Sequence, residues 1–299
     1  MHLKIDLEII DKRNMSKKPV IIGIGELLWD MLPTGKKAGG APINFVYHAS
    51  RLGAESYAIS AVGNDALGDE IMSEIDKIGI HYLIERIDFP TGTVEVELKN
   101  GIPNYIINEG VAWDHIPLTE TMKDLAKKAN AVCFGTLAQR HPDSRLTIQT
   151  ILSLVPERAF RILDINIRQR YYSKELIETS LQQSNILKIN DEELLLLKEL
   201  FGKQTATDDE MCKELIEKYH LKYLILTAGA SYSKIFTPET SSRILTPKVE
   251  VADTVGAGDA FTGAFISSVI DGKSLVESHQ AAVDRAALVC TRPGAWVNE

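Results

Sequence analysis

The chain has 299 residues, of which 44% are hydrophobic and 25% are charged, so it carries enough apolar side chains to bury a sizeable globular core. Its formal net charge is −8. Because no basic excess offsets phosphate repulsion, we expect neither a nucleic-acid partner nor an anionic-membrane partner. No apolar run reaches the roughly 20 residues that span a bilayer.

The first 18 residues mix charged and apolar side chains without the apolar core of a signal peptide. We expect them to form a loose leader ahead of one domain over residues 19–299. The three cysteines, Cys133, Cys212 and Cys290, lie far apart in the sequence and form no paired spacing. They indicate a reducing, cytoplasmic setting and neither a disulfide framework nor a metal site. The seven histidines show no metal-ligand spacing either.

Strand and helix patterns alternate through most of the chain. Apolar runs predict buried strands at residues 19–25, 57–62, 131–134, 161–165, 185–189 and 223–227. Helical periodicity predicts helices at residues 42–52, 67–78, 119–129, 176–183, 192–201, 208–219, 257–271 and 275–290. The alternation predicts an α/β fold with a parallel sheet that helices cover on both faces. Two hairpin-like strands are expected at 233–236 and 243–245, and they lead to residues 248–251.

The alternation stops between residues 82 and 110. Strand-like runs at 82–87, 92–99 and 104–107 follow one another with no helix between them. The segment Lys99-Asn100-Gly101 predicts a hairpin turn between the last two. We therefore expect a small antiparallel flap whose strands come mainly from residues 82–110.

Polar and glycine-rich segments follow four of the predicted strands, at residues 25–30, 164–168, 190–193 and 227–229. In a parallel α/β sheet, ligands bind at the carboxyl ends of the strands. The pattern locates a site at that edge without naming its reaction.

The stretch Asp253-Thr254-Val255-Gly256-Ala257-Gly258-Asp259 precedes a predicted helix. The small residues let backbone N–H groups approach an anion, and the positive helix end adds to the attraction. Asp259 would be an odd anion ligand, but it suits a base that removes a proton from an attacking hydroxyl. A simple glycine-containing helix start explains the local pattern equally well. The lysine of a Gly-x-x-x-x-Gly-Lys-Ser/Thr loop is missing, which excludes a P-loop enzyme on motif grounds.

The same stretch, with Ala260-Phe261, resembles the C-terminal signature of the ribokinase-like (PfkB) carbohydrate kinases. Other matches follow in family order. They are Gly39-Gly40-Ala41-Pro42-Ile43-Asn44, Gly63-Asn64-Asp65-Ala66-Leu67-Gly68 and Asn190-Asp191-Glu192-Glu193. The resemblance implies a Rossmann-like αβα sandwich with a small β-sheet lid, which transfers the γ-phosphate of ATP to a sugar hydroxyl.

At the phosphate end, the resemblance makes Asp259 the catalytic base and the backbone N–H groups of Gly256, Ala257 and Gly258 the anion hole. It assigns Asn190 and Glu193 to Mg²⁺, through water. Read alone, these two residues fit a strand-to-helix cap better.

The nucleotide would contact Asn190, Thr227 and Gly229, together with the loop at Gly294 and Ala295. That loop would also carry a potassium site made mainly of backbone carbonyl groups. Tyr232 stands where the family has a further glycine, so either this turn is rebuilt or Tyr232 joins the nucleotide pocket.

At the sugar end, the resemblance assigns Asp30, Gly39, Gly40 and Asn44 to sugar hydroxyls; read alone, Asp30 fits a surface turn. Residues 90–94, 101–105 and 109–114 look like the lid region of bacterial fructokinases. Residues 164–168 resemble a stretch that fructokinases share with 2-keto-3-deoxygluconate kinases. Arg168 would stabilise phosphate charge or orient the substrate, or else simply pair with Asp164.

These matches predict a fructokinase that forms fructose 6-phosphate. A kinase for 2-keto-3-deoxygluconate or another sugar is the first alternative, in which Arg140, Arg168 or Arg170 would bind a substrate carboxylate. A catalytically silent sugar sensor is the alternative from another class, although the intact Asp259 loop argues against it. Pairing of two chains through the lid, as in relatives that dimerise, stays open.

Overall fold

The computed structural model describes residues 18–32, 35–99 and 102–297. The leader expected at residues 1–18 therefore lies almost entirely outside the described residues, as do Asn100 and Gly101 of the expected hairpin turn. Within the described part, no helix is both long and apolar enough to cross a membrane.

The strands are β1 (Val20–Ile24), β2 (Leu28–Leu32), β3 (Gly35–Gly39), β4 (Glu55–Gly63), β5 (His81–Ile87), β6 (Gly92–Lys99), β7 (Ile102–Ile107), β8 (Ala131–Phe134), β9 (Phe160–Asp164), β10 (Ile186–Asn190), β11 (Tyr223–Ala228), β12 (Tyr232–Phe236) and β13 (Ser241–Leu245). The α-helices are α2 (Ala41–Arg51), α3 (Ala66–Ile78), α4 (Glu120–Ala126), α5 (Pro142–Leu154), α6 (Lys174–Gln182), α7 (Asp191–Leu200), α8 (Asp208–Tyr219), α9 (Ala257–Ile270) and α10 (Leu275–Cys290). Two short 3-10 helices are η1 (Ala112–His115) and η2 (Leu137–Gln139).

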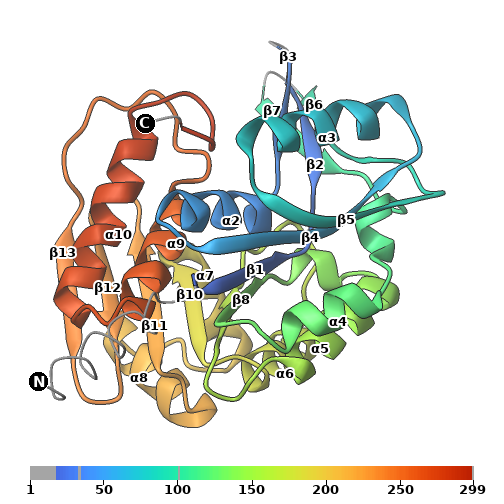
Figure 1. Ribbon diagram of the computed structural model, residues 1–299. Helices are drawn as coiled ribbons and strands as arrows, with labels where there is room; N and C mark the ends of the chain where they lie inside the picture. The colour runs from blue at the N-terminus through green and yellow to red at the C-terminus, as the bar shows by residue number, and fades with distance from the viewer. Residues whose placement is uncertain (1–17, 33–34, 100–101, 298–299) are drawn as a thin grey trace, which may run out of the picture.

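A nine-stranded sheet forms the centre, in the order β13-β12-β11-β10-β9-β8-β1-β4-β5. The strands from β5 to β11 run parallel, and β12 and β13 add an antiparallel edge. Figure 1 shows α2, α9 and α10 on one side of this sheet and α4, α5 and α6 on the other. The chain therefore has the expected three-layered αβα architecture.

The sequence of β1 explains why both faces are covered. Successive side chains of a strand point to opposite faces of the sheet. All five residues of β1 are buried, so both faces of the sheet must be covered here. Ile22 and Ile24 pack in the core that lies toward α5 and α6, whereas Ile21 packs in the core toward α2 and α9. Each face thus buries its own apolar layer.

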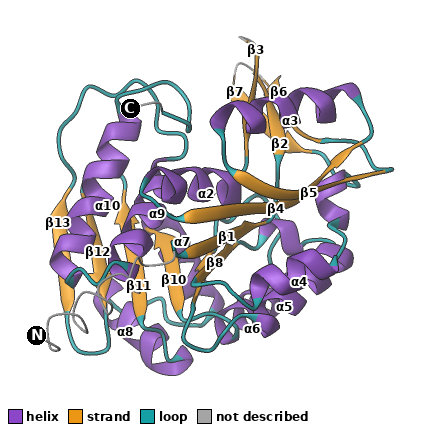
Figure 2. Ribbon diagram, viewed as in Figure 1, coloured by secondary structure: helices purple, strands orange, loops and turns teal. Residues whose placement is uncertain are grey.

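The small sheet has the order β3-β2-β6-β7 and stands at one end of the large sheet, where Figure 2 shows its strands rising above β4 and β5. This corrects two expectations. The strand β5 pairs in parallel with β4 in the large sheet, so it is not part of the flap. The segment at residues 28–39, for which we predicted no strand, supplies β2 and β3, and β2 pairs in parallel with β6.

Residues 248–251, which follow the two expected hairpin strands, form no regular element. They instead lead from the sheet to the loop ahead of α9.

Candidate active site

A cavity of about 920 Å³ lies between the carboxyl edge of the large sheet and the small sheet. Most of the predicted site residues line it, from segments far apart in the sequence: Asp30, Gly39, Gly40, Asn44, Arg168, Asn190, Glu193, Gly256, Gly258 and Asp259. The position agrees with the rule that open α/β sheets bind ligands beyond the carboxyl ends of their strands.

Asp259 lies in the first turn of α9 and faces the cavity. Asn44 donates a hydrogen bond from Nδ2 to Asp259 Oδ2 at 2.9 Å, and the indole of Trp296 donates to Asn44 Oδ1, also at 2.9 Å. These two bonds fix the orientation of the amide and of the carboxylate. Burial raises the pKa of Asp259, while Lys188 and the bond from Asn44 oppose this effect. A raised pKa makes a carboxylate a better proton acceptor.

Lys188 is a cavity residue that we did not predict. It lies inside the buried strand β10, and its Nζ contacts Asp164 Oδ1 at 3.1 Å. A side chain on Gly258 would come within 3.2 Å of the same Nζ, which places the ammonium group against the start of α9. Burial alone would lower the pKa of Lys188, but Asp164 and other nearby carboxylates outweigh burial and raise it. The cavity therefore holds a permanent positive charge beside Asp259.

A lysine among the apolar residues of a central strand is itself a signal in the sequence, because a charged side chain is seldom buried without a partner. The segment Ile186-Leu187-Lys188-Ile189 contains that anomaly, next to the Asn190 motif. One alternative from the sequence was that Arg168 pairs with Asp164. Among the described residues, the ion-pair partner of Asp164 is Lys188 and not Arg168.

Glu26 is the second residue that we did not predict. It follows β1, is 3% exposed, and its Oε2 has no hydrogen-bond partner among the described residues. Burial raises the pKa of Glu26 to about 7, and the nearby charge of Asp259 adds to the shift. A proton on Glu26 at neutral pH therefore relieves repulsion between two buried carboxyl groups.

We expect Glu26→Gln to be more stable than the wild type at pH 8 and about equally stable near pH 5. The folded pKa of Glu26, about 7, lies above its unfolded value of 4.5, so the folded state holds the proton more tightly. Stability is thus lost as pH rises from 4.5 through 7, and the loss is complete above that range. The substitution removes this loss, which corresponds to a Tm difference on the order of 5 °C at pH 8. Melting curves from pH 5 to 8 measure it, and a pH-independent difference would contradict the assignment.

The predicted anion hole lies at the start of α9. Gly256 is the N-cap of this helix and has a left-handed φ of 77°. A Cβ at this position would lie 2.5 Å from that of Ala295, so the turn requires glycine. The N–H of Ala257 donates a 3.3 Å bond to Thr254, and Ala257 does not line the cavity. Of the three predicted anion-hole residues, Gly256 and Gly258 therefore border the cavity directly.

Asn190 and Glu193 form a reciprocal cap at the start of α7. Asn190 Oδ1 accepts from the backbone N–H of Glu193 at 2.8 Å, and Glu193 Oε2 accepts from that of Asn190 at 2.8 Å. Glu193 Oε1 accepts a third bond, from Ile167 at 2.9 Å. Each carboxylate oxygen thus already accepts one N–H group and keeps a lone pair for water. Oxygen donors of this kind fit Mg²⁺ held through its retained waters.

Of the predicted nucleotide residues, Asn190 lines the cavity, whereas Thr227, Gly229, Gly294 and Ala295 lie beside it. Thr227 is the sheet neighbour of Asn190, and Gly229 follows it in the turn after β11. The N–H of Gly294 donates to Asp253 at 3.0 Å, and Ala295 packs against Gly256. The last two residues therefore support the loop that leads into α9.

Tyr232 begins β12, and the guanidinium of Arg243 stacks on its ring at 4.3 Å. It is absent from the cavity wall. Thr227 and Gly229 are absent from it as well, so the two predictions for Tyr232, a rebuilt turn or a place in the nucleotide pocket, both stand.

Of the three arginines considered for a substrate carboxylate, only Arg168 lines the cavity. Arg140 is buried, binds Asp114 through two nitrogens at 2.7 and 2.9 Å, and stacks on Trp113. Arg170 is largely exposed and lies 3.6 Å from Glu109. Arg168 is exposed at the cavity mouth, and its charge lowers the pKa of Asp30, Asp164 and Asp259 against the larger effect of their burial.

Comparison with known proteins defines the class to which this fold and cavity belong. The profile of the pfkB family of carbohydrate kinases matches residues 20–298, so the chain belongs to this family and is a phosphotransferase.

A more specific likeness is to the uncharacterized sugar kinase PH1459 of Pyrococcus horikoshii. It is 27% identical, with 93% of this chain and 92% of the relative covered, and its crystal structure superposes with a TM-score of 0.79. The fructokinase of Rhizobium leguminosarum bv. trifolii is 28% identical, with 90% and 85% covered. The structure of the ATP-bound fructokinase of Xylella fastidiosa, at 21% identity and a TM-score of 0.82 over 94% of both chains, has the same fold.

Proposed function

We propose that the chain transfers the γ-phosphoryl group of ATP to the primary hydroxyl of fructose, forming fructose 6-phosphate and ADP. The observation that carries the proposal is the position of Asp259. It lies in one cavity with the polar groups of Asp30 and Asn44 and with Gly256 and Gly258 at the start of its own helix, α9. A hydroxyl bound among these polar side chains would thus lie close to both a proton acceptor and a phosphate-binding helix end.

In this proposal Asp259 accepts the proton of the attacking hydroxyl, and Asn44 keeps its carboxylate oriented toward the sugar. Gly256, Gly258 and Lys188 stabilise the negative charge of the transferred group. ATP with Mg²⁺ supplies the phosphoryl group and neutralises part of its charge. Asn190 and Glu193 would hold the waters of that ion, and Thr227 and Gly229 would border the nucleotide.

Support for fructose comes from the relatives, several of which are named fructokinases at 24–28% identity. The 6-phosphofructokinase of Thermoanaerobacterium thermosaccharolyticum is 27% identical, so a phosphorylated sugar belongs among the substrates tested. A kinase for 2-keto-3-deoxygluconate is the second candidate, because Arg168 at the cavity mouth could bind its carboxylate.

A coupled assay of ADP release tests the proposal on fructose, fructose 6-phosphate, 2-keto-3-deoxygluconate, ribose and adenosine. We expect the highest kcat/KM for fructose. A higher value for the sugar acid would move the proposal to the second candidate. Sugar binding without turnover of any substrate would instead indicate a silent sensor.

We expect Arg168→Gln to lower kcat with fructose roughly tenfold or more while KM stays nearly constant. The reason is that a neutral sugar does not need the guanidinium, whereas the transferred phosphoryl group gains from it. Arg170→Gln is the matched control, because Arg170 is exposed and does not line the cavity. Steady-state kinetics separate the two constants, and a raised KM at constant kcat would assign Arg168 to the substrate.

The setting of the enzyme is part of the proposal. From the cysteine pattern we infer a cytoplasmic enzyme. We also infer a potassium site formed by backbone carbonyl groups near Gly294 and Ala295. We also infer a homodimer that pairs through the small sheet, whose edge strands β3 and β7 offer backbone groups for pairing. Activity measured with and without K⁺ tests the potassium site, and light scattering in solution tests the homodimer.

A further inference from the structure

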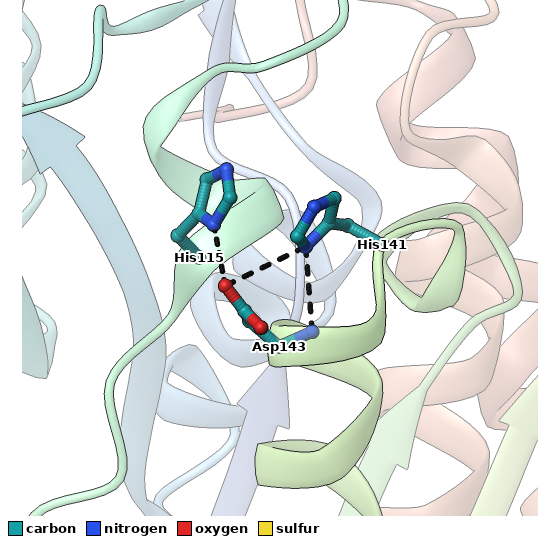
Figure 3. Close-up of side chains that lie close together, drawn as sticks. All are labelled: His115, His141 and Asp143. Atoms are coloured by element: carbon teal, nitrogen blue, oxygen red, sulfur yellow. Dashed lines mark hydrogen bonds and ion pairs between the residues drawn. The ribbon is translucent and has the colours of Figure 1, made fainter.

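A cluster of two histidines and an aspartate lies away from the cavity, where η1 meets the start of α5. His115 ends η1, His141 is the N-cap of α5, and Asp143 lies in the first turn of α5. Figure 3 shows the three side chains turned toward one another. His115 Nδ1 is 2.7 Å and His141 Nδ1 is 3.7 Å from Asp143 Oδ2. None of the three lines the active-site cavity.

We propose that His115, His141 and Asp143 form a binding site for a divalent transition-metal ion of the zinc type. Each residue offers one ligand atom, and these atoms all lie within 4.8 Å of one another. Two imidazole nitrogens and a carboxylate oxygen form a donor set that zinc, cobalt and nickel bind well, whereas magnesium prefers oxygen ligands alone.

The distances suit a tetrahedral ion. With bonds of about 2.0–2.1 Å, the ligand atoms of a tetrahedral zinc site lie roughly 3.3 Å apart. The separations of 2.7 and 3.7 Å lie on either side of that value, and the ligand atoms of the two histidines lie within 4.8 Å of each other. Rotations of the side chains would bring the three atoms around one ion. The long 3.3 Å bond from the N–H of Asp143 to His141 Nδ1 would be given up, at the small cost of one weak helix cap.

The backbone around the cluster is already fixed. Ser144, the neighbour of Asp143, donates to the carbonyl of Trp113 at 2.8 Å and accepts from the N–H of Ile116 at 2.8 Å. These bonds hold η1 against α5 on both sides of His115. The ring of Phe89 also stacks on His115, with a centroid distance of 3.7 Å and an interplanar angle of 14°. The binding site is therefore largely formed before an ion arrives.

An ion would have access to the cluster and keep an open position. The side chain of His115 is 15% exposed, that of His141 is 39% exposed and that of Asp143 is 60% exposed. Three protein ligands with a water at the fourth position are common for zinc.

The test is a calorimetric titration of the full-length, nucleotide-free protein with Zn²⁺ in excess Mg²⁺, which occupies sites that prefer oxygen ligands. We expect one ion to bind per chain. Each of His115→Ala, His141→Ala and Asp143→Asn should weaken binding by roughly tenfold or more. His81→Ala and Asp124→Asn, at exposed positions away from the cluster, should bind Zn²⁺ like the wild type.

Titration with Co²⁺ gives a second readout. A visible absorption band typical of tetrahedral coordination should appear in the wild type and be lost in Asp143→Asn, a near-isosteric change that leaves the exposed helix start intact. The proposal fails if the wild type binds no Zn²⁺. It fails equally if all three cluster variants bind the ion as tightly as the wild type, which would leave the cluster as a helix cap with a histidine–aspartate pair.

Discussion

Replacing Asp259 with asparagine is expected to lower kcat by about 10²–10⁴-fold, the usual contribution of a general base. An amide has the shape of the carboxylate but cannot accept the proton of the sugar hydroxyl. The affinities for ATP and sugar should change little, because Asn44 and the helix start that surround this position remain. Coupled ADP release measures the turnover, and calorimetry measures the two affinities.

Stability distinguishes this prediction from simple damage to the fold. Burial raises the folded pKa of Asp259 above its usual value of 3.8, so the folded state binds that proton more tightly than the unfolded state does. Stability is lost as pH rises from the unfolded pKa through the folded pKa, and the loss is complete at higher pH. Asp259→Asn should therefore be at least as stable as the wild type at pH 8. Asp271→Asn, at the other end of α9, is the matched control for activity. Near-normal turnover in Asp259→Asn would refute the role of base.

Replacing Lys188 with methionine should impair both stability and turnover. The change leaves Asp164 buried without its partner, and breaking a buried ion pair in this way costs about 3–5 kcal/mol. It also removes the positive charge that faces Gly258, and loss of one such charge-stabilising group lowers kcat by about 10²–10³-fold. Urea unfolding and steady-state kinetics measure the two effects.

A double variant separates the two roles of Lys188. In Lys188→Met with Asp164→Asn, the carboxylate that forms the ion pair with Lys188 is removed together with it, so part of the lost stability should return. Turnover should stay low, because the positive charge is still missing. Lys234→Met, which breaks an ion pair with the exposed Asp209, is the control for loss of a lysine. Recovery of activity in the double variant would show that Lys188 acts only through the fold.

The parts of the fold that the sequence predicted are those with a strong apolar pattern. The runs at β1, β8 and β11 are apolar on both faces, and a buried parallel strand is the structure that such a short run favours. The short strands β2 and β3 were missed. Gly35-Lys36-Lys37-Ala38-Gly39 has no apolar alternation, and its pairing with β2 is decided by tertiary contacts. The pattern of β5 indicated a strand correctly but not the sheet to which it belongs.

A similar division holds for the site. The family resemblance predicted roles for Asp259, Asn44 and Asn190, because each lies in a short motif that is continuous in the sequence. Lys188 and Glu26 lie outside these motifs, and their importance depends on burial and on neighbours from other strands. The cluster of His115, His141 and Asp143 depends on the packing of η1 against α5, which spacing along the chain does not reveal.

The path of the chain from β1 into β2 has a consequence for how substrate affinity is set. Asp30 and Gly39 belong to the small sheet, whereas Asn44 and Asp259 belong to the helices of the large sheet. A ligand that contacts both sets binds only those conformers in which the sheets have the right separation. Its measured affinity therefore includes the free energy of reaching that separation. Substitutions at Gly25 and Leu27, which belong to the three-residue connection but do not line the cavity, can thus change the KM for the sugar without touching the sugar.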